Sequence, residues 1–223
     1  MLKSILIFIF ILLSVTSFSQ YEAECFNQKK NEILLAIENA PRDSMHFQDT
    51  LVIDNVKRYV DTMFVMRNMD VDSYISKIIG CRMPDFNFFN LNKEEFSINK
   101  TKSEFIILNF SFECGDICNY QLEQYSKLQK VLGDSVAIYN IYEEPDKKVK
   151  EYVQGIGIDN LQFVANADLL TYHYSMSVRR PFLYLLDRHK NIIYMKCGQS
   201  QTESRVYMYE TLLQKIRATN CSD

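Results

Sequence analysis

The sequence predicts an α/β fold with a mixed central sheet. Three observations favour it. Strand-length apolar stretches alternate with helix-like stretches after Gly80, one of these stretches is apolar at nearly every position, and the last two strands flank a short turn. Strands separated by helices pair in parallel, whereas strands joined by a tight turn are antiparallel, so one sheet should contain both arrangements.

The chain begins with the pattern of a secretory signal. Lys3 precedes an apolar run over residues 5–13, and small residues follow at Ser17 and Ser19. The run is too short to span a bilayer, so we expect a signal peptide over residues 1–19, with cleavage before Gln20. The mature protein would then be exported to the periplasm or cell envelope, and would contact the membrane only if the signal stayed uncleaved.

Residues 20–79 are expected to form a helical N-terminal extension. Apolar residues recur there at three- and four-residue spacing without strand alternation, and Gly80 ends the pattern. After Gly80 we first expect a hairpin over 84–100, a buried strand over 104–112, and a helix over about 120–132 ended by Gly133. A strand over 135–144, a helix from Pro145, and a short strand over 161–166 with a short helix after it should follow. The chain should end with a strand pair over 182–187 and 191–198 and an amphipathic helix over 202–219.

Composition limits the classes of function. The chain has 223 residues, which is enough for one domain with an appendage, and 47% of them are apolar. The formal net charge of -3 provides no basic field for nucleic acid, so no nucleic-acid partner is expected.

Two of the six cysteines are close together in sequence. Cys114 and Cys118 follow the strand over residues 104–112 and precede a helix, so they should lie where unpaired N–H groups and the helix dipole favour a thiolate. In a helical turn their Cα atoms would be roughly 6 Å apart, a distance that a disulfide tolerates. The other four are either buried small side chains or members of a structural bridge, with the pairing left open: Cys25, Cys81, Cys197 and Cys221.

From Gly80 onward the chain resembles a thioredoxin-fold redoxin, and is most similar to exported TlpA-like thiol–disulfide oxidoreductases. Four segments carry the resemblance: "PDFNFFNL" resembles the entry hairpin, "FIILNFSFECGDIC" the strand and active-site turn, "VRRPFLYLLD" the strand led by a cis-proline, and "NIIYMKCG" the last strand with its glycine. The resemblance implies a thioredoxin-like three-layer sandwich over residues 80–223.

The same resemblance implies the site and its chemistry. Cys114 would attack a client's disulfide or thiol pair and Cys118 would resolve the mixed disulfide. Pro181, with Arg180 beside it, would line the groove that holds the client chain. No dissociable cofactor is expected, because an upstream redox protein would supply or remove the electrons.

The chain departs from the family's Trp-Cys-x-x-Cys motif. When Cys118 is aligned with the second cysteine, Gly115 takes the nucleophile's place and Cys114 the tryptophan's. The attacking thiol would have moved back by one residue, and a non-catalytic protein that keeps only the fold is the alternative.

Two related families share these residues. Sco-type copper chaperones also have C-x-x-x-C, and Cys114 and Cys118 would be the copper ligands, but the histidine expected before the later strand is replaced by Arg179 and its neighbours. In peroxiredoxins a hydroxyl precedes the cysteine, as Ser111 does here. Their arginine, six residues before the strand-ending aspartate, corresponds to Pro181, which favours disulfide exchange over peroxide reduction.

Overall fold

The structure is a computed structural model, and it describes residues 24–32, 35, 76–111, 116–167, 182–197 and 208–220. The predicted signal peptide and most of the predicted N-terminal extension lie outside these residues. So does most of the short helix expected after residue 166. The division of the chain at residues 19 and 79 therefore stays a prediction.

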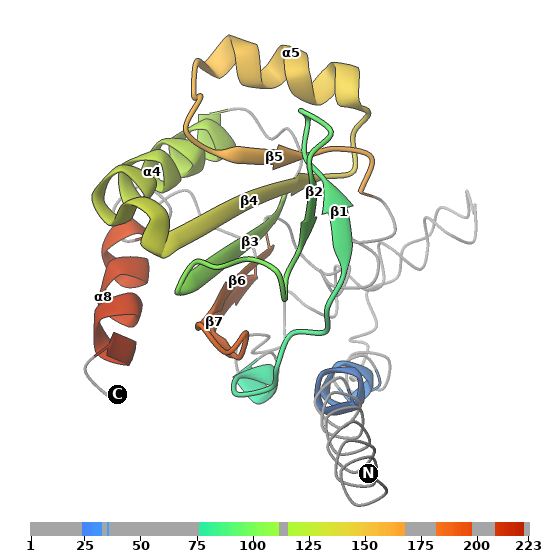
Figure 1. The fold of residues 1–223 in the computed structure, drawn as a ribbon, viewed down its shortest axis with the longest axis vertical. Coiled ribbons are helices and arrows are strands. Elements are labelled where there is room, and N and C mark those ends of the chain that lie inside the picture. The colour runs from blue at the N-terminus through green and yellow to red at the C-terminus, as the bar shows by residue number, and fades with distance from the viewer. Residues whose placement is uncertain are drawn as a thin grey trace, which may run out of the picture.

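A five-stranded mixed sheet forms the centre of the fold (Figure 1). The strands run in the order β5-β4-β3-β6-β7 and comprise β3 (Phe105–Ser111), β4 (Val136–Tyr142), β5 (Gln162–Val164), β6 (Phe182–Leu186) and β7 (Ile192–Cys197). The first three strands of that order are parallel, whereas β6 is antiparallel to both β3 and β7. The α/β class and the mixed sheet predicted from the sequence are confirmed.

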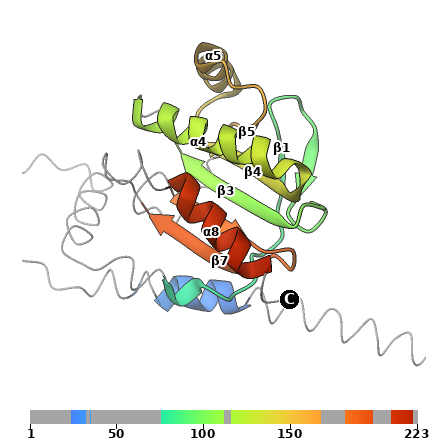
Figure 2. The same cartoon turned by 90° about the vertical axis from the view of Figure 1, so that its left-hand side faces the viewer.

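Two helices cover one face of this sheet. They are α4 (Asp116–Leu132) and α8 (Met208–Asn220), and Figure 2 shows them lying together in front of the strands. A third helix, α5 (Asp146–Ile156), follows its N-cap Pro145 and ends at Gly157, whose φ of 65° is the left-handed conformation that glycine adopts without strain. Gly133, with a φ of 56°, ends α4 as predicted and leads through the short η2 (Gly133–Ser135) into β4.

The opposite face is covered by a hairpin. Strands β1 (Asn87–Phe89) and β2 (Glu95–Ser97) pair antiparallel, as the sequence predicts. Phe88 and Phe96 bring their rings to 5.0 and 5.4 Å from the ring of Tyr139 on β4. We call this side of the sheet the hairpin face and the side under α4 and α8 the helix face.

The hairpin face also receives the N-terminal helical segment. This segment comprises the described helical residues 24–32 and 35, and its Phe26 is buried with its ring 6.3 Å from that of Tyr184 on β6. The 3-10 helix η1 (Ser76–Ile78) adds the buried Ile78 to the same core. The described part of the predicted extension therefore shares the core of the sheet.

Both edges of the sheet are partly covered by backbone pairing. The Gly80 N–H donates to the carbonyl of Ile192 in β7 at 2.8 Å, and the Met83 N–H donates to that of Lys190, just before β7, at 2.9 Å. On the other edge, the Leu91 N–H donates to Phe163 of β5 at 2.9 Å. These hydrogen bonds occupy backbone groups at the sheet edges that would otherwise be open to pairing with a strand of another chain. None of the helices in the described ranges has the length and apolar character needed to cross a bilayer.

Strand β3 is buried at all seven positions, which confirms the strand predicted to be covered on both sides. Alternate residues point to opposite faces, so Ile106, Leu108 and Phe110 belong to the hairpin-face core, whereas Phe105 and Ile107 belong to the helix-face core. The C-terminal half of β3 therefore presents Asn109 and Ser111 to α4.

Candidate functional site

The candidate site lies where β3 leads into α4. Cys118 is the third residue of α4 and is 1% exposed, while Cys114, Arg180 and Pro181 lie outside the described residues. The sequence predicted the helix to start near residue 120, which is wrong by about one turn, because α4 begins at Asp116. Cys118 accordingly lies among the unpaired N–H groups of the helix N-terminus, where the dipole favours a thiolate.

Cys118 is disulfide-bonded, to a cysteine whose side chain the structure does not describe. Cys25 and Cys81 form a separate disulfide with each other, which decides the pairing of those two cysteines that the sequence left open. Three cysteines remain whose side chains the structure does not describe: Cys114, Cys197 and Cys221.

The Ser111 hydroxyl lies against the Cys118 sulfur. The Oγ–Sγ distance is 3.6 Å, and both side chains are 1% exposed. A sulfur within a disulfide carries no hydrogen, so Ser111 is the donor in this contact. The end of β3 thus directs an O–H at one sulfur of a disulfide.

A buried polar network continues from this contact along the helix face. Asn109 Nδ2 donates to Asn140 Oδ1 across the β3–β4 pair at 3.0 Å, and Gln121 of α4 donates to Asn109 Oδ1 at 3.2 Å. Gln121 also donates to the hydroxyl of Tyr125, and Asn140 donates to the Gln162 carbonyl at 3.3 Å. These amides satisfy one another in a site without water access, which holds α4 in register with the strands.

Tyr142 lies on β4, where it is the register partner of Ser111. Its side chain is 1% exposed, and its hydroxyl makes no hydrogen bond of normal geometry within the described part of the chain. Burial raises the pKa of Tyr142 well above the usual value, the charges of Tyr152 and Glu144 act in the same direction, and the adjacent Ser111 side chain acts against them.

Further bonds fix the position of α4. The Tyr152 hydroxyl of α5 donates to Asn119 Oδ1 in the first turn of α4 at 2.7 Å. Ser126 donates to Asn160 Oδ1 at 2.7 Å, and Asn160 Nδ2 returns a bond to the Ser126 carbonyl at 3.0 Å. The helix that carries Cys118 is therefore attached both to the sheet and to the α5 side of the fold.

Sequence reasoning missed most of this network. Asn109 and Ser111 interrupt an apolar strand at positions two apart, and Asn140 and Tyr142 do the same on the next strand. A period of two places each pair on one face, so polar residues at matching positions near the ends of neighbouring strands were the available signal.

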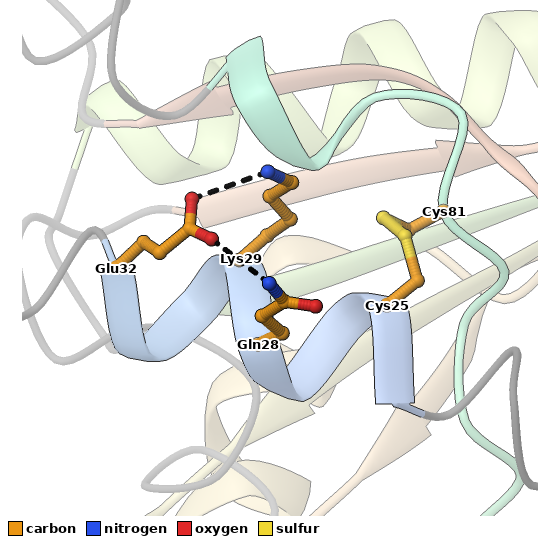
Figure 3. Close-up of a disulfide and its surroundings, with 5 residues drawn as sticks. All are labelled: Cys25, Gln28, Lys29, Glu32 and Cys81. Carbon is orange, nitrogen blue, oxygen red and sulfur yellow. Dashed lines mark hydrogen bonds and ion pairs between the residues drawn. A yellow bond between two sulfur atoms is a disulfide. The ribbon is translucent and has the colours of Figure 1, made fainter.

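The Cys25–Cys81 disulfide lies on the hairpin face (Figure 3). Its Cα atoms are 5.7 Å apart, and it joins the N-terminal helical segment to the chain just after η1. Within that segment, Glu32 accepts from Gln28 at 3.2 Å and from Lys29 at 3.1 Å, pairs whose three- and four-residue spacing supports a helix.

The structure brings no third copper ligand to Cys118 within its described ranges. No group of three or more His, Cys, Asp or Glu side chains gathers there in a geometry that would hold a metal ion. His189 lies in the turn before β7, where Arg188 Nε donates to its Nε2 at 3.3 Å. The other half of the expected ligand pair, Cys114, lies outside those ranges.

No protein-family model matches the sequence, and no curated protein is significantly similar to it. Solved structures do match. A Chlorobium tepidum protein assigned as the thiol:disulfide interchange protein DsbE has a TM-score of 0.54 at 13% identity, covering 63% of this chain and 96% of its own. The exposed lipoprotein thioredoxin Etrx1 of Streptococcus pneumoniae has a TM-score of 0.50 at 15% identity, covering 60% and 98%.

A peroxiredoxin-like protein from Aquifex aeolicus is also similar, with a TM-score of 0.51 at 11% identity over 63% of this chain and 86% of its own. At such low identity these likenesses establish the fold and leave the activity to the site. The expected fold is confirmed: the chain has a thioredoxin-like fold, and thiol–disulfide oxidoreductases are among its structural neighbours.

Proposed function

We propose that the protein is an exported thiol–disulfide oxidoreductase that exchanges disulfides with client proteins through Cys114 and Cys118. The observation that carries the proposal is the disulfide of Cys118, in the first turn of the helix that follows the central strand of a thioredoxin-like fold. Sulfur at a helix N-terminus is stabilised as thiolate, so a bond made there is readily exchanged.

Cys114 is the proposed partner of Cys118. The two are four residues apart, close to one helical turn, whereas Cys197 and Cys221 are distant in sequence. Cys118 is 1% exposed, so a client sulfur cannot approach it, and the first attack is assigned to its partner.

The exchange takes two steps. In the reducing direction, the Cys114 thiolate attacks a client disulfide, forms a mixed disulfide and releases one client thiolate. The Cys118 thiolate then attacks Cys114 Sγ, which releases the second client thiolate and leaves a Cys114–Cys118 disulfide. Two electrons have passed to the client, and an upstream dithiol partner restores them by the reverse exchange.

The same proposal includes a groove that binds the client chain and an exported location. Pro181 and Arg180 would line the client groove, since a proline leaves backbone groups free to pair with an extended chain. No dissociable cofactor is required. Export is supported by the signal pattern in residues 1–19 and by the separate Cys25–Cys81 disulfide, because such bonds persist in oxidising compartments.

Insulin reduction by the mature protein, with dithiothreitol as electron donor, tests the proposal. Cys114→Ser and Cys118→Ser should each abolish turnover, and Cys118→Ser should accumulate a mixed disulfide because nothing resolves it. Cys197→Ser and Cys221→Ser are the matched controls and should keep activity. Full activity in Cys114→Ser would overturn the proposal.

The alternatives give distinct outcomes in the same preparations. A copper-handling protein would lack insulin reductase activity and take up Cu(I) stoichiometrically, with uptake lost in both cysteine variants. A thiol peroxidase would consume hydrogen peroxide in a manner that depends on Cys114. A non-catalytic protein that keeps the fold would do none of these.

A further inference from the structure

Ser111 contacts the sulfur of Cys118 inside the fold. Ser111 Oγ lies 3.6 Å from Cys118 Sγ, and both residues are buried at the end of β3 and the start of α4. A disulfide sulfur is a poor acceptor, so this bond contributes little in the oxidised state. A thiolate at the same position is a strong acceptor.

The burial of Cys118 decides which sulfur becomes that thiolate. An attacking thiolate cannot reach Cys118, which is 1% exposed, so the disulfide can open only by attack on the partner sulfur. Cys118 must therefore be the leaving group, and its negative charge develops in a site without solvent. Such charge needs a donor already in position.

We propose that Ser111 is a catalytic hydrogen-bond donor, which stabilises the Cys118 sulfur as it leaves as thiolate. The inference rests on the proposed function only in requiring that the Cys118 disulfide opens and closes.

Opening of the Cys118 disulfide is a displacement at sulfur. A thiolate attacks the partner sulfur, a new S–S bond forms, and the bond to Cys118 breaks with its electron pair on Cys118 Sγ. The Ser111 O–H shortens its hydrogen bond to that sulfur without giving up its proton. The bond is stronger in the transition state than in the ground state, which is the condition for a rate effect.

Two measurements on the mature chain test the inference without a client. The first is the rate at which dithiothreitol opens the Cys118 disulfide, followed by acid quenching and mass spectrometry, which separates it from Cys25–Cys81. The second is the pKa of the reduced Cys118 thiol, obtained from its ¹³Cβ shift. Ser111→Ala should slow opening roughly tenfold and raise the thiol pKa by about one unit, the size expected for one bond to a charged acceptor.

A control variant isolates the Ser111 hydroxyl. Tyr125→Phe removes another buried hydroxyl of the same face, which is bonded to Gln121, and should leave the opening rate unchanged. Should Ser111→Ala fail to fold, the isosteric pair Ser111→Thr and Ser111→Val replaces it, with the threonine variant opening faster.

Equal opening rates and equal thiol pKa values in the wild type and the serine variants would overturn the inference. Insulin reduction enters neither measurement. A protein without client activity but with the Ser111 effect would therefore contradict the proposed function alone.

Discussion

The two faces of the central sheet are built from alternate residues of the same strands, yet they differ in kind. On the hairpin face, β3 and β4 contribute Leu108, Phe110, Tyr139 and Ile141 to a hydrophobic core. On the helix face, the corresponding ends of these strands contribute Asn109, Ser111, Asn140 and Tyr142. The strand positions of the hairpin face are thus filled by apolar side chains, whereas several buried positions of the helix face hold hydroxyl and amide groups.

The disulfides of Cys25–Cys81 and of Cys118 also lie on different faces of the sheet. The disulfide on the hairpin face joins Cys25 to Cys81, with the N-terminal helical segment held against an apolar core. The disulfide on the helix face involves Cys118 and lies beside a hydroxyl donor. The two disulfides therefore differ in their recorded surroundings, since Cys25 and Cys81 pack against the apolar hairpin-face core, whereas Cys118 lies beside the Ser111 hydroxyl.

The largest expected effect comes from opening a cavity on the hairpin face. Phe110→Ala removes a fully buried ring that packs edge-on against Tyr184, and should lower the free energy of unfolding by about 4 kcal/mol. Guanidinium unfolding measures it. Val131→Ala, on the exposed side of α4, is the control and should cost under about 0.5 kcal/mol. A loss in Phe110→Ala as small as the control's would contradict the apolar assignment of this face.

Next in size is the loss of the hairpin-face disulfide. Cys25→Ser and Cys81→Ser together should lower stability by about 4 kcal/mol or slightly less, because the bond closes a loop with a sequence separation of 56 residues. Thermal and guanidinium unfolding under oxidising conditions would show it, and a reductant should abolish the difference. Insulin reduction should stay within about twofold of wild type, whereas a complete loss would show that the faces are coupled.

The amide network should respond as a unit. Asn109→Leu or Asn140→Leu alone leaves a buried amide without its partner, at a cost of about 2 kcal/mol each. The double variant removes both partners, so its cost should be at least about 1 kcal/mol below the sum. A double-mutant cycle measures the difference. Strict additivity would mean that the two amides do not depend on each other.

A smaller effect of opposite sign is expected at Tyr142. Tyr142→Phe removes a buried hydroxyl that lacks a hydrogen bond of normal geometry, and should raise stability by up to about 1 kcal/mol. Tyr125→Phe is the matched control, and should lower stability by about 1 kcal/mol because its hydroxyl is bonded to Gln121. The same sign in both variants would contradict the difference drawn between the two tyrosines.

The smallest effect is a pH dependence of stability. Burial raises the pKa of Tyr142, so the native state keeps its proton while the unfolded chain begins to lose one near pH 10. Stability should therefore fall with rising pH, by about 0.4 kcal/mol at pH 10 for this one group. Urea unfolding at pH 8 and pH 10 should show a smaller fall in Tyr142→Phe, and an equal fall would exclude Tyr142 as a contributor.

The fold could be predicted well from the sequence, because alternating and continuous apolar stretches indicate directly which residues of a strand are buried. The continuous apolar stretch before the cysteines became β3, and the turn-separated stretches after Pro84 became the β1–β2 hairpin. The start of α4 was misplaced by about one turn, since only two apolar residues, Ile117 and Cys118, fall in its first turn and so short a stretch shows no helical period.

The site could be predicted only in part. Spacing singled out Cys118, but the pairing of Cys25 with Cys81 depends on how distant segments meet across the sheet, which no local pattern records. The contact from Ser111 to Cys118 likewise needed the path from β3 into α4.

The Cys25–Cys81 bond also makes a covalent ring of the chain between these two residues. A protease that cut once anywhere inside this ring would leave a single molecule of unchanged mass apart from one added water. Its fragments would separate on a gel only after reduction. The segment bearing Phe26 would thus stay attached to the sheet after such a nick, held at an effective concentration that dilution cannot lower.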